Sequence, residues 1–276
     1  MKVKFGLLAA PVIAAAFAAC TSDSTGRVSL AMSSVRPGGP APSATVFGGV
    51  ASPSVVTAGD STVISMGNDT IVIRSAELVL REVELKRVEA QECDNVEGND
   101  DCDEFETGPF LVALPLGTTA TETVVSIDAA PGMYDELQFK IHKPEDDSSG
   151  DDAFLAAHPT FARISIRVTG TYSQAGTRSD FTYESDLNAE QEVLLSPPLT
   201  VTEGQPANVT LRIDIASWFL NAAGSALVNP ATANKGQPNE QVVENRIQAS
   251  IDAFRDDDHD GHDDDDVNDD NSGPGI

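Results

Sequence analysis

The acidic C-terminal tail contains the one segment of this sequence whose residues have metal-ligand spacing. Residues 256–264 read DDDHDGHDD, which matches the start of a calcium-binding loop, D-x-D-x-D-G-x-x-D. Carboxylates on alternate residues converge on one ion, and the glycine at position 261 allows the sharp turn. The predicted ligands are Asp256, Asp258, Asp260, His262 and Asp264. The sequence therefore predicts calcium as a cofactor, bound with millimolar rather than micromolar affinity.

Two features of the tail leave other interpretations open. Position 12 of the loop is Val267 and not the bidentate glutamate that closes an EF-hand, so the predicted site is incomplete. A run this rich in aspartate also matches the pattern through low complexity alone. His259 and His262 would favour nickel, copper or zinc if their imidazoles bind, and are exposed spacers if they do not.

The three cysteines divide into a pair and a single residue. Cys93 and Cys102 lie in one acidic stretch, whereas Cys20 ends an apolar segment. In an oxidising compartment Cys93 and Cys102 are predicted to form a disulfide, and a remaining thiol would be reactive unless it is modified. A zinc site at Cys93 and Cys102 is the alternative, although that stretch offers no further Cys or His to complete a tetrahedron.

The first 20 residues have the pattern of an export signal. Lys2 and Lys4 precede an uncharged run of 15 residues, 5–19, which is shorter than the roughly 18 residues that a helix needs to cross a bilayer. The run ends in Phe-Ala-Ala-Cys at positions 17–20, which resembles a lipobox, with Phe17 in place of the usual Leu. We therefore expect residues 1–19 to be removed and Cys20 to carry a lipid that anchors the protein in the membrane. Cleavage by ordinary signal peptidase, which would leave a soluble protein, is the alternative.

Composition and motifs argue against two classes of function. The net charge is −27, from 44 acidic and 17 basic residues, so nucleic acid is not an expected partner, because a nucleic-acid surface must neutralise phosphates. The sequence has no zinc-protease motif, nucleophile elbow or phosphate-binding glycine loop. No catalytic residues are predicted, and we expect a protein that is not an enzyme.

The elements that must position these residues are mainly strands. Short stretches of β-branched and aromatic residues at partial period-2 spacing follow one another, separated by turn formers such as Pro131-Gly132. A hairpin turn is predicted at Gly67-Asn68. Residues 76–85 alternate with a change of phase, which predicts a long strand with a bulge near Arg81-Glu82, or alternatively a helix. This pattern predicts a mainly β fold, an antiparallel β-sandwich of prealbumin-like or immunoglobulin-like type.

The predicted organisation of the chain follows from these elements. After the signal at 1–19, we expect a lipidated cysteine and flexible tether at 20–44, which includes a short first strand at 28–32. The sandwich domain is predicted over 45–238. A short C-terminal helix is predicted within 239–255, because apolar residues from 240 to 254 recur with a period near 3.6 after Asn239 as a cap. Residues 256–276 are predicted to be an acidic tail.

Three segments give the chain a likeness to a known family. They are IRSAELVLREVEL at 73–85, AAPGMYDELQF at 129–139 and LRIDI at 211–215. In this order the segments resemble the DUF4382 lipoprotein domains, whose function is unknown and which are prealbumin-like β-sandwiches. The resemblance implies the fold and the lipoprotein class, and it implies no catalytic residue. The acidic insert at 89–106 departs from the family pattern.

The sequence thus favours a non-enzymatic lipoprotein of the bacterial cell envelope that uses calcium for binding or adhesion, with an envelope protein or glycan as partner. Thr21 after the lipidated cysteine favours the outer membrane over the inner. A carbohydrate-binding module is the first alternative, but aromatic residues make up only 5% of the chain, with a single Trp, so a stacking surface for sugars is poorly supplied. An exported hydrolase that uses paired carboxylates is the second.

Overall fold

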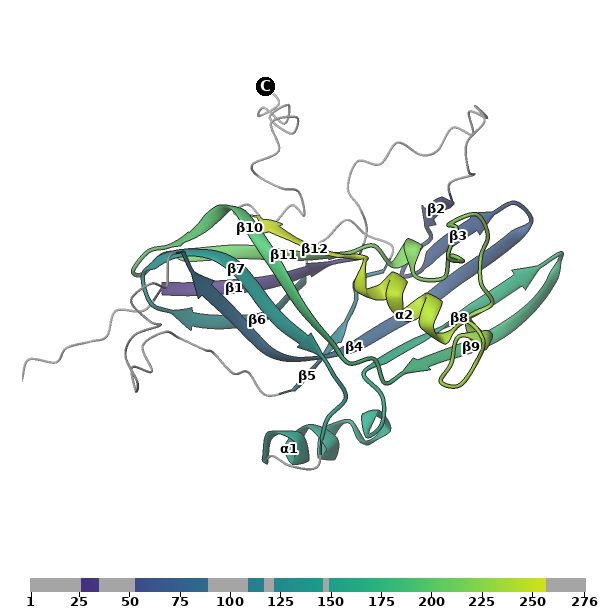
Figure 1. Ribbon diagram of the computed structural model, residues 1–276, viewed down its shortest axis with the longest axis horizontal. Coiled ribbons are helices and arrows are strands. Elements are labelled where there is room, and N and C mark those ends of the chain that lie inside the picture. The colour runs from purple at the N-terminus through teal and green to yellow at the C-terminus, as the bar shows by residue number, and fades with distance from the viewer. Residues whose placement is uncertain (1–25, 35–52, 89–108, 117–121, 146–148, 257–276) are drawn as a thin grey trace, which may run out of the picture.

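The protein is mainly β in a computed structural model that describes residues 26–34, 53–88, 109–116, 122–145 and 149–256 (Figure 1). The strands are β1 (Gly26–Ser33), β2 (Ser54–Thr57), β3 (Thr62–Met66), β4 (Asp69–Arg87), β5 (Phe110–Ala113), β6 (Glu122–Ala129), β7 (Gly132–Ile141), β8 (Ile166–Gln174), β9 (Thr177–Ser185), β10 (Ala189–Val201), β11 (Pro206–Ile213) and β12 (Ile251–Arg255). The helices are α1 (Ser149–Ala157) and α2 (Glu240–Gln248), with 3-10 turns η2 (Pro159–Phe161), η3 (Ile215–Ser217) and η4 (Pro230–Thr232). Within this part of the chain, no helix is both long and apolar enough to cross a membrane.

Two sheets pack as a sandwich, as the alternating pattern predicted. The smaller sheet has the order β12-β11-β1-β6, and the larger follows β10-β7-β4-β3-β2, with β5 and β8 also paired to β4 and β9 paired to β8. Neighbouring strands are antiparallel except for β1 and β11, which run parallel. Side chains from both sheets form one continuous core, which includes the fully buried Trp218, Tyr134 and Phe139.

Local sequence features gave two correct predictions within the larger sheet. Met66 pairs with Asp69, so Gly67 and Asn68 form the two-residue turn of the β3–β4 hairpin, and Gly67 has φ of +60°. In β4 the register with β7 shifts between Arg81 and Glu84, and Glu82 has φ of 49°. The predicted bulge is therefore confirmed, and the alternative of a helix over residues 76–85 is wrong.

The C-terminal helix is shorter than predicted. Helix α2 ends at Gln248, and residues 251–255 form strand β12, which pairs with β11 from Ile213↔Ile251 to Val209↔Arg255. The predicted helix over 240–254 is thus wrong in its last part. The physical reason is that β11 has an edge whose backbone groups need partners, and Ile251–Arg255 supplies them.

The first strand begins earlier than predicted and belongs to the folded body. β1 pairs with β6 on one side and β11 on the other, from Gly26 onward. The predicted first strand at 28–32 is therefore confirmed, and it extends over 26–33. Only the five residues 21–25 separate Cys20 from the first strand.

The long axis of the sandwich has two different ends (Figure 1). At one end, called here the β1 end, lie the start of β1, the β6–β7 turn, the β10–β11 turn and the last residues of β4. The pairs Gly26↔Ala129, Gly132↔Val201 and Arg87↔Tyr134 hold these segments together. The β8–β9 hairpin and α2 lie towards the opposite end (Figure 1).

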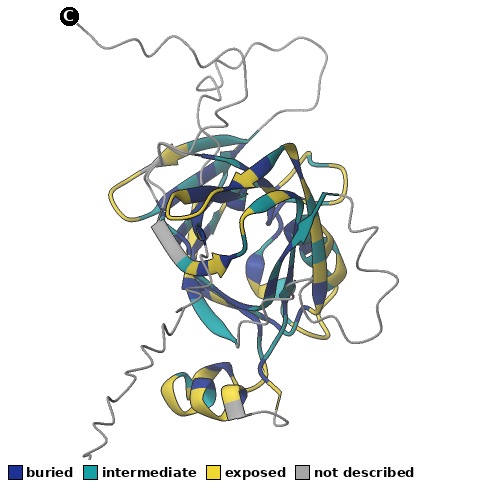
Figure 2. Cartoon of the chain, turned by 90° about the vertical axis from the view of Figure 1, so that its left-hand side faces the viewer, coloured by how far each residue is buried: buried dark blue, intermediate teal, exposed yellow. Residues whose placement is uncertain are grey.

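The connection between β7 and β8 carries α1 and η2, which stand outside the sandwich (Figure 2). They pack on it through a second, small apolar cluster of Val79, Phe154 and Phe161. The acidic stretch at residues 145–152 lies in this connection. Part of it begins α1, because Phe154 finds an apolar contact on β4.

Candidate metal centre

Most of the site residues predicted from the sequence lie outside the described residues. These are Cys20, Cys93, Cys102, Asp258, Asp260, His262 and Asp264. Asp256 is described, and it is fully buried directly after β12. The hydroxyl of Thr210 donates a hydrogen bond to Asp256 Oδ2 at 2.6 Å. The first predicted calcium ligand is thus held by a hydroxyl of β11, and the calcium loop at 256–264 stays a prediction.

A group of carboxylates that no sequence motif predicts lies in the folded body. Asp186, Glu240 and Glu244 each place one oxygen within 4.8 Å of the others, and all three side chains are half-buried. We call these three residues the carboxylate cluster. Carboxylate oxygens are the ligands that calcium prefers.

Two elements and one loop position the carboxylate cluster. Asp186 follows the last residue of β9, and Glu240 and Glu244 lie one turn apart on α2. Asn234, in the loop between η4 and α2, fastens that loop to β9. Its Oδ1 accepts a hydrogen bond from the backbone N–H of Glu184 at 2.7 Å, and its Nδ2 donates to the carbonyl of Thr182 at 3.2 Å.

Each carboxylate has one oxygen bound by a donor of the protein. Ser185 Oγ donates to Glu244 Oε1 at 2.7 Å, and the backbone N–H of Gly236 donates to Glu240 Oε2 at 2.5 Å. Lys235 forms an ion pair with Asp186 Oδ2. With one oxygen from each side chain, the cluster offers at most three of the roughly six to eight oxygen ligands that calcium takes, with water as the rest.

The charges of the cluster are not balanced by the protein alone. Glu240 and Glu244 are spaced i and i+4 on one helix, and like charges at this spacing destabilise a helix. Lys235 pairs with Asp186 and Lys143 also attracts this carboxylate, whereas Glu240 and Glu244 form no ion pair among the described residues. Burial works to raise the pKa of Asp186, but the hydrogen bond and charge of Lys235 outweigh it, so this pKa lies below its ordinary value. The pKa of Lys235 is raised, first by its bond to Asp186.

Tyr183 lies beneath the cluster on the inner face of β9. Its side chain is fully buried, and among the described residues its hydroxyl has no hydrogen-bond partner. Burial raises the pKa of Tyr183 far above its ordinary value, and the charges of Glu244 and Glu240 add to this, while the nearby Ser185 hydroxyl opposes it. The negative charges of Glu240 and Glu244 therefore help to keep this buried phenol neutral.

This environment predicts an alkaline limit to stability that Tyr183→Phe removes. Because the pKa of Tyr183 is higher in the folded than in the unfolded chain, its contribution is complete below about pH 10 and is lost as pH rises further, by about 1.4 kcal/mol for each pH unit. Urea unfolding of wild type and Tyr183→Phe at several pH values between neutral and alkaline checks this. An equally steep loss of stability above pH 10 in both proteins would contradict it.

A pocket of about 400 Å³ opens beside the carboxylate cluster. Asp186 and Lys235 belong to its wall, together with Arg163, Ile164, Thr182, Glu184 and Asn234. Charges of both signs therefore face this space. An ion at the cluster would be reachable from the solvent through the pocket.

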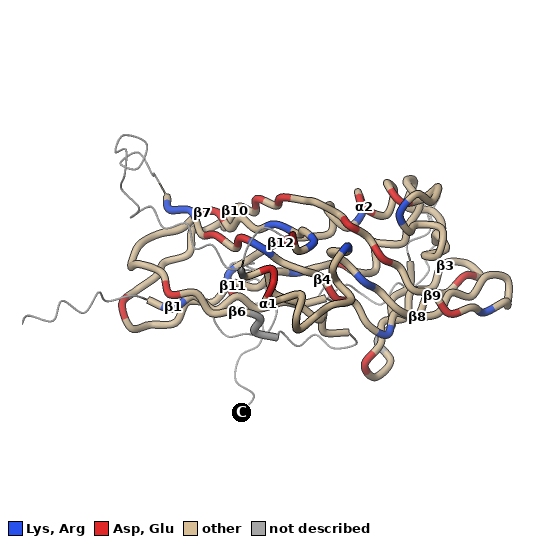
Figure 3. The backbone as a smooth tube through the Cα atoms, turned by 90° about the horizontal axis from the view of Figure 1, so that it is seen from below, with Lys and Arg blue, Asp and Glu red and all other residues tan. Residues whose placement is uncertain are grey.

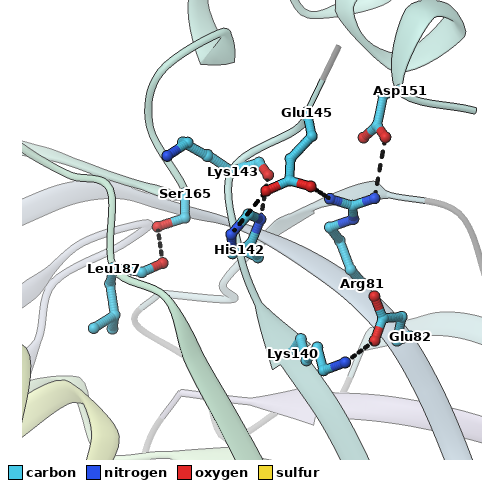
Figure 4. Close-up of polar contacts among 9 residues, drawn as sticks. All are labelled: Arg81, Glu82, Lys140, His142, Lys143, Glu145, Asp151, Ser165 and Leu187. Atoms are coloured by element: carbon cyan, nitrogen blue, oxygen red, sulfur yellow. Dashed lines mark hydrogen bonds and ion pairs between the residues drawn. The ribbon is translucent and has the colours of Figure 1, made fainter. Parts of the chain in front are cut away.

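A second polar network, at the base of α1, has a different character (Figure 4). Arg81, at the bulge of β4, forms an ion pair with Asp151 of α1 at 3.0 Å and approaches Glu145 at 3.9 Å. Glu145 also faces His142 Nε2 at 3.4 Å, while Lys140 pairs with Glu82. Because basic groups meet each of these acids, the network joins α1 to β4 and offers no unbalanced charge for a metal.

The carboxylate cluster left one signal in the sequence, the acidic pair Glu240 and Glu244 at helical spacing within a predicted helix. Asp186 could not be assigned to it, because only the tertiary packing of α2 beside β9 brings it there. In Figure 3 acidic residues appear on many elements, so acidity alone does not mark this site.

Comparison with known proteins gives little guidance. No family model matches the chain, and no curated protein matches it. Among solved structures, the chain is similar to MbnP from Methylosinus trichosporium, with 13% identity and a TM-score of 0.33 over 84% of this chain and 98% of that chain. At this TM-score the similarity carries no argument about function, and the likeness to DUF4382 domains stays a prediction.

Proposed function

We propose that this protein is a non-enzymatic lipoprotein of the bacterial cell envelope that binds a divalent cation, calcium first, at Asp186, Glu240 and Glu244. The observation that carries the proposal is the convergence of three half-buried carboxylates within 4.8 Å with one lysine to balance them.

The arrangement of the fold suits a binding protein that is held at a membrane. Cys20, the proposed lipid attachment, precedes β1 by a short tether, whereas the carboxylate cluster lies on β9 and α2, away from the β1 end (Figure 1). A cation bound there would face the surroundings of the membrane and could recruit an acidic envelope glycan or protein. The expected affinity is millimolar, because only about three protein oxygens are available.

Calcium calorimetry with residues 21–276 tests the proposal. Wild type is expected to bind one calcium, and Glu244→Gln is expected to weaken binding by roughly tenfold or more, because calcium affinity depends on the number of charged ligands. Glu203→Gln makes the same chemical change in an exposed turn and should bind like wild type. Equal affinities of all three proteins, or no heat from wild type at millimolar calcium, would refute the cation site.

A further inference from the structure

We infer that the β1 end of the sandwich rests on the phospholipid bilayer, with the side chain of Met133 in contact with lipid. This inference rests on the proposed lipid anchor at Cys20. It adds an interaction surface and an orientation, which the anchor alone does not imply.

The length of the tether restricts the position of this end. Residues 21–25 lie between Cys20 and Gly26, so a fully extended chain places the two Cα atoms at most about 21 Å apart. Strand β1 itself, with 8 residues, is longer, at about 26 Å. The β1 end must therefore stay near the membrane, while the far end of the sandwich can point away from it.

The point at which the tether leaves the body is also fixed. Gly26 is tightly packed, since a Cβ atom there would lie 2.4 Å from Val201 Cγ1 and 3.0 Å from the carbonyl oxygen of Thr202. Gly26 also pairs with Ala129 on β6. The tether thus emerges between the β6–β7 turn and the β10–β11 turn, and these turns are the parts of the body closest to the lipid.

One exposed apolar side chain lies at the same place, and a second, Leu194, lies further along the sheet, where it pairs with Glu136. Three large hydrophobic side chains are exposed among the described residues, and two of them, Met133 at 51% and Leu194 at 72%, lie on the neighbouring strands β7 and β10. Met133 is the second residue of β7, directly after the β6–β7 turn, and pairs with Thr200. Its backbone is fixed, because its carbonyl accepts a hydrogen bond from Val88 N–H at 3.0 Å. A rigidly held apolar side chain beside a lipid tether fits contact with the bilayer interface.

The described basic side chains at this end lie against acidic or aromatic partners. Arg27 pairs with Asp128 at 3.6 Å, and Lys86 pairs with Glu136 at 2.6 Å. Arg87 lies over the ring of Tyr134 at 5.6 Å. Among the described residues of this end, basic side chains therefore lie beside the acids of β6 and β7.

Quenching by brominated lipid tests the contact in the full lipidated protein. In vesicles of brominated phosphatidylcholine, the added emission of Met133→Trp is expected to fall about twofold relative to vesicles without bromine, because the indole would lie at the headgroup and acyl boundary. Val56→Trp is the matched control, since Val56 is equally exposed, at 57%, but lies on β2 away from the β1 end. The native Trp218 is fully buried and adds the same background to both variants.

The outcomes separate this inference from the proposed function. If the lipidated chain does not float with vesicles, the anchor is refuted and the inference falls with it. If it floats but Met133→Trp is quenched no more than Val56→Trp, the anchor stands and the orientation is wrong. Leu194→Trp provides a second probe on β10, with partial quenching expected.

Discussion

Replacing Arg81 by alanine is expected to lower the free energy of unfolding by about 3 kcal/mol, because this change breaks a buried ion pair. Arg81 is only 15% exposed and its partner Asp151 is fully buried, with Nη2 and Oδ2 3.0 Å apart. Removing the guanidinium leaves that buried carboxylate without the cation that faces it. Breaking a buried pair in this way costs more than the pair itself contributes.

The matched control for Arg81→Ala lies on the same strand. Arg74 of β4 pairs with Asp180 at 3.3 Å, but these side chains are 49% and 84% exposed. Solvent screens such a pair, so Arg74→Ala is expected to cost less than about 1 kcal/mol. Urea unfolding of the two variants measures the difference, and equal losses would show that the network in Figure 4 does not hold α1 on the sandwich.

Replacing Cys20 by alanine is expected to release the protein completely from the membrane fraction and to abolish labelling with palmitate. Stable anchoring needs two or more acyl chains, and this variant lacks the thiol that we propose as the site of lipid attachment. Cell fractionation and labelling of wild type and the variant measure this effect.

Cys93→Ala serves as the control for Cys20→Ala, because it also removes one thiol but is expected to leave the anchor in place. Membrane association or labelling of Cys20→Ala would contradict the anchor. A soluble wild-type protein would show instead that ordinary signal peptidase cleaves the export signal.

Features that depend on neighbouring residues could be predicted from the sequence. The turn at Gly67-Asn68 and the bulge at Arg81-Glu82 follow from local φ preferences and from a change in alternation, and both are confirmed. The sandwich itself follows from many short alternating strands. These signals are contained within a few residues, so no knowledge of the tertiary structure is needed.

Features that depend on pairing between distant segments could not be predicted in the same way. The apolar spacing of residues 251–254 fits either a helical turn or a strand, and the edge of β11 decides for the strand. Residues 26–33 form a strand because they pair with β6 on one side and with β11 on the other. Glu240 and Glu244 show helical spacing, but the carboxylate cluster forms only when α2 packs next to Asp186.

The protein has two candidate calcium sites, one in the acidic tail and one in the folded body. The tail has the better sequence motif, yet its first residue, Asp256, is buried and bound by Thr210. The carboxylate cluster has no motif, yet its charges exceed what Lys235 can balance. If calcium binds at the carboxylate cluster, substitutions there abolish stabilisation by calcium and substitutions in the tail leave it unchanged. If calcium binds in the tail, the reverse is expected.

Thermal unfolding with and without calcium, on two paired variants of residues 21–276, tests the cation site most directly. Glu240→Gln/Glu244→Gln is expected to be slightly more stable than wild type without calcium, because a like-charge helix pair is removed, and to gain no stability from calcium. Asp258→Asn/Asp260→Asn is expected to gain as much as wild type, about 2.7 kcal/mol at a hundredfold excess over the dissociation constant. A gain that survives in the first variant and disappears in the second would contradict the account and assign calcium to the tail.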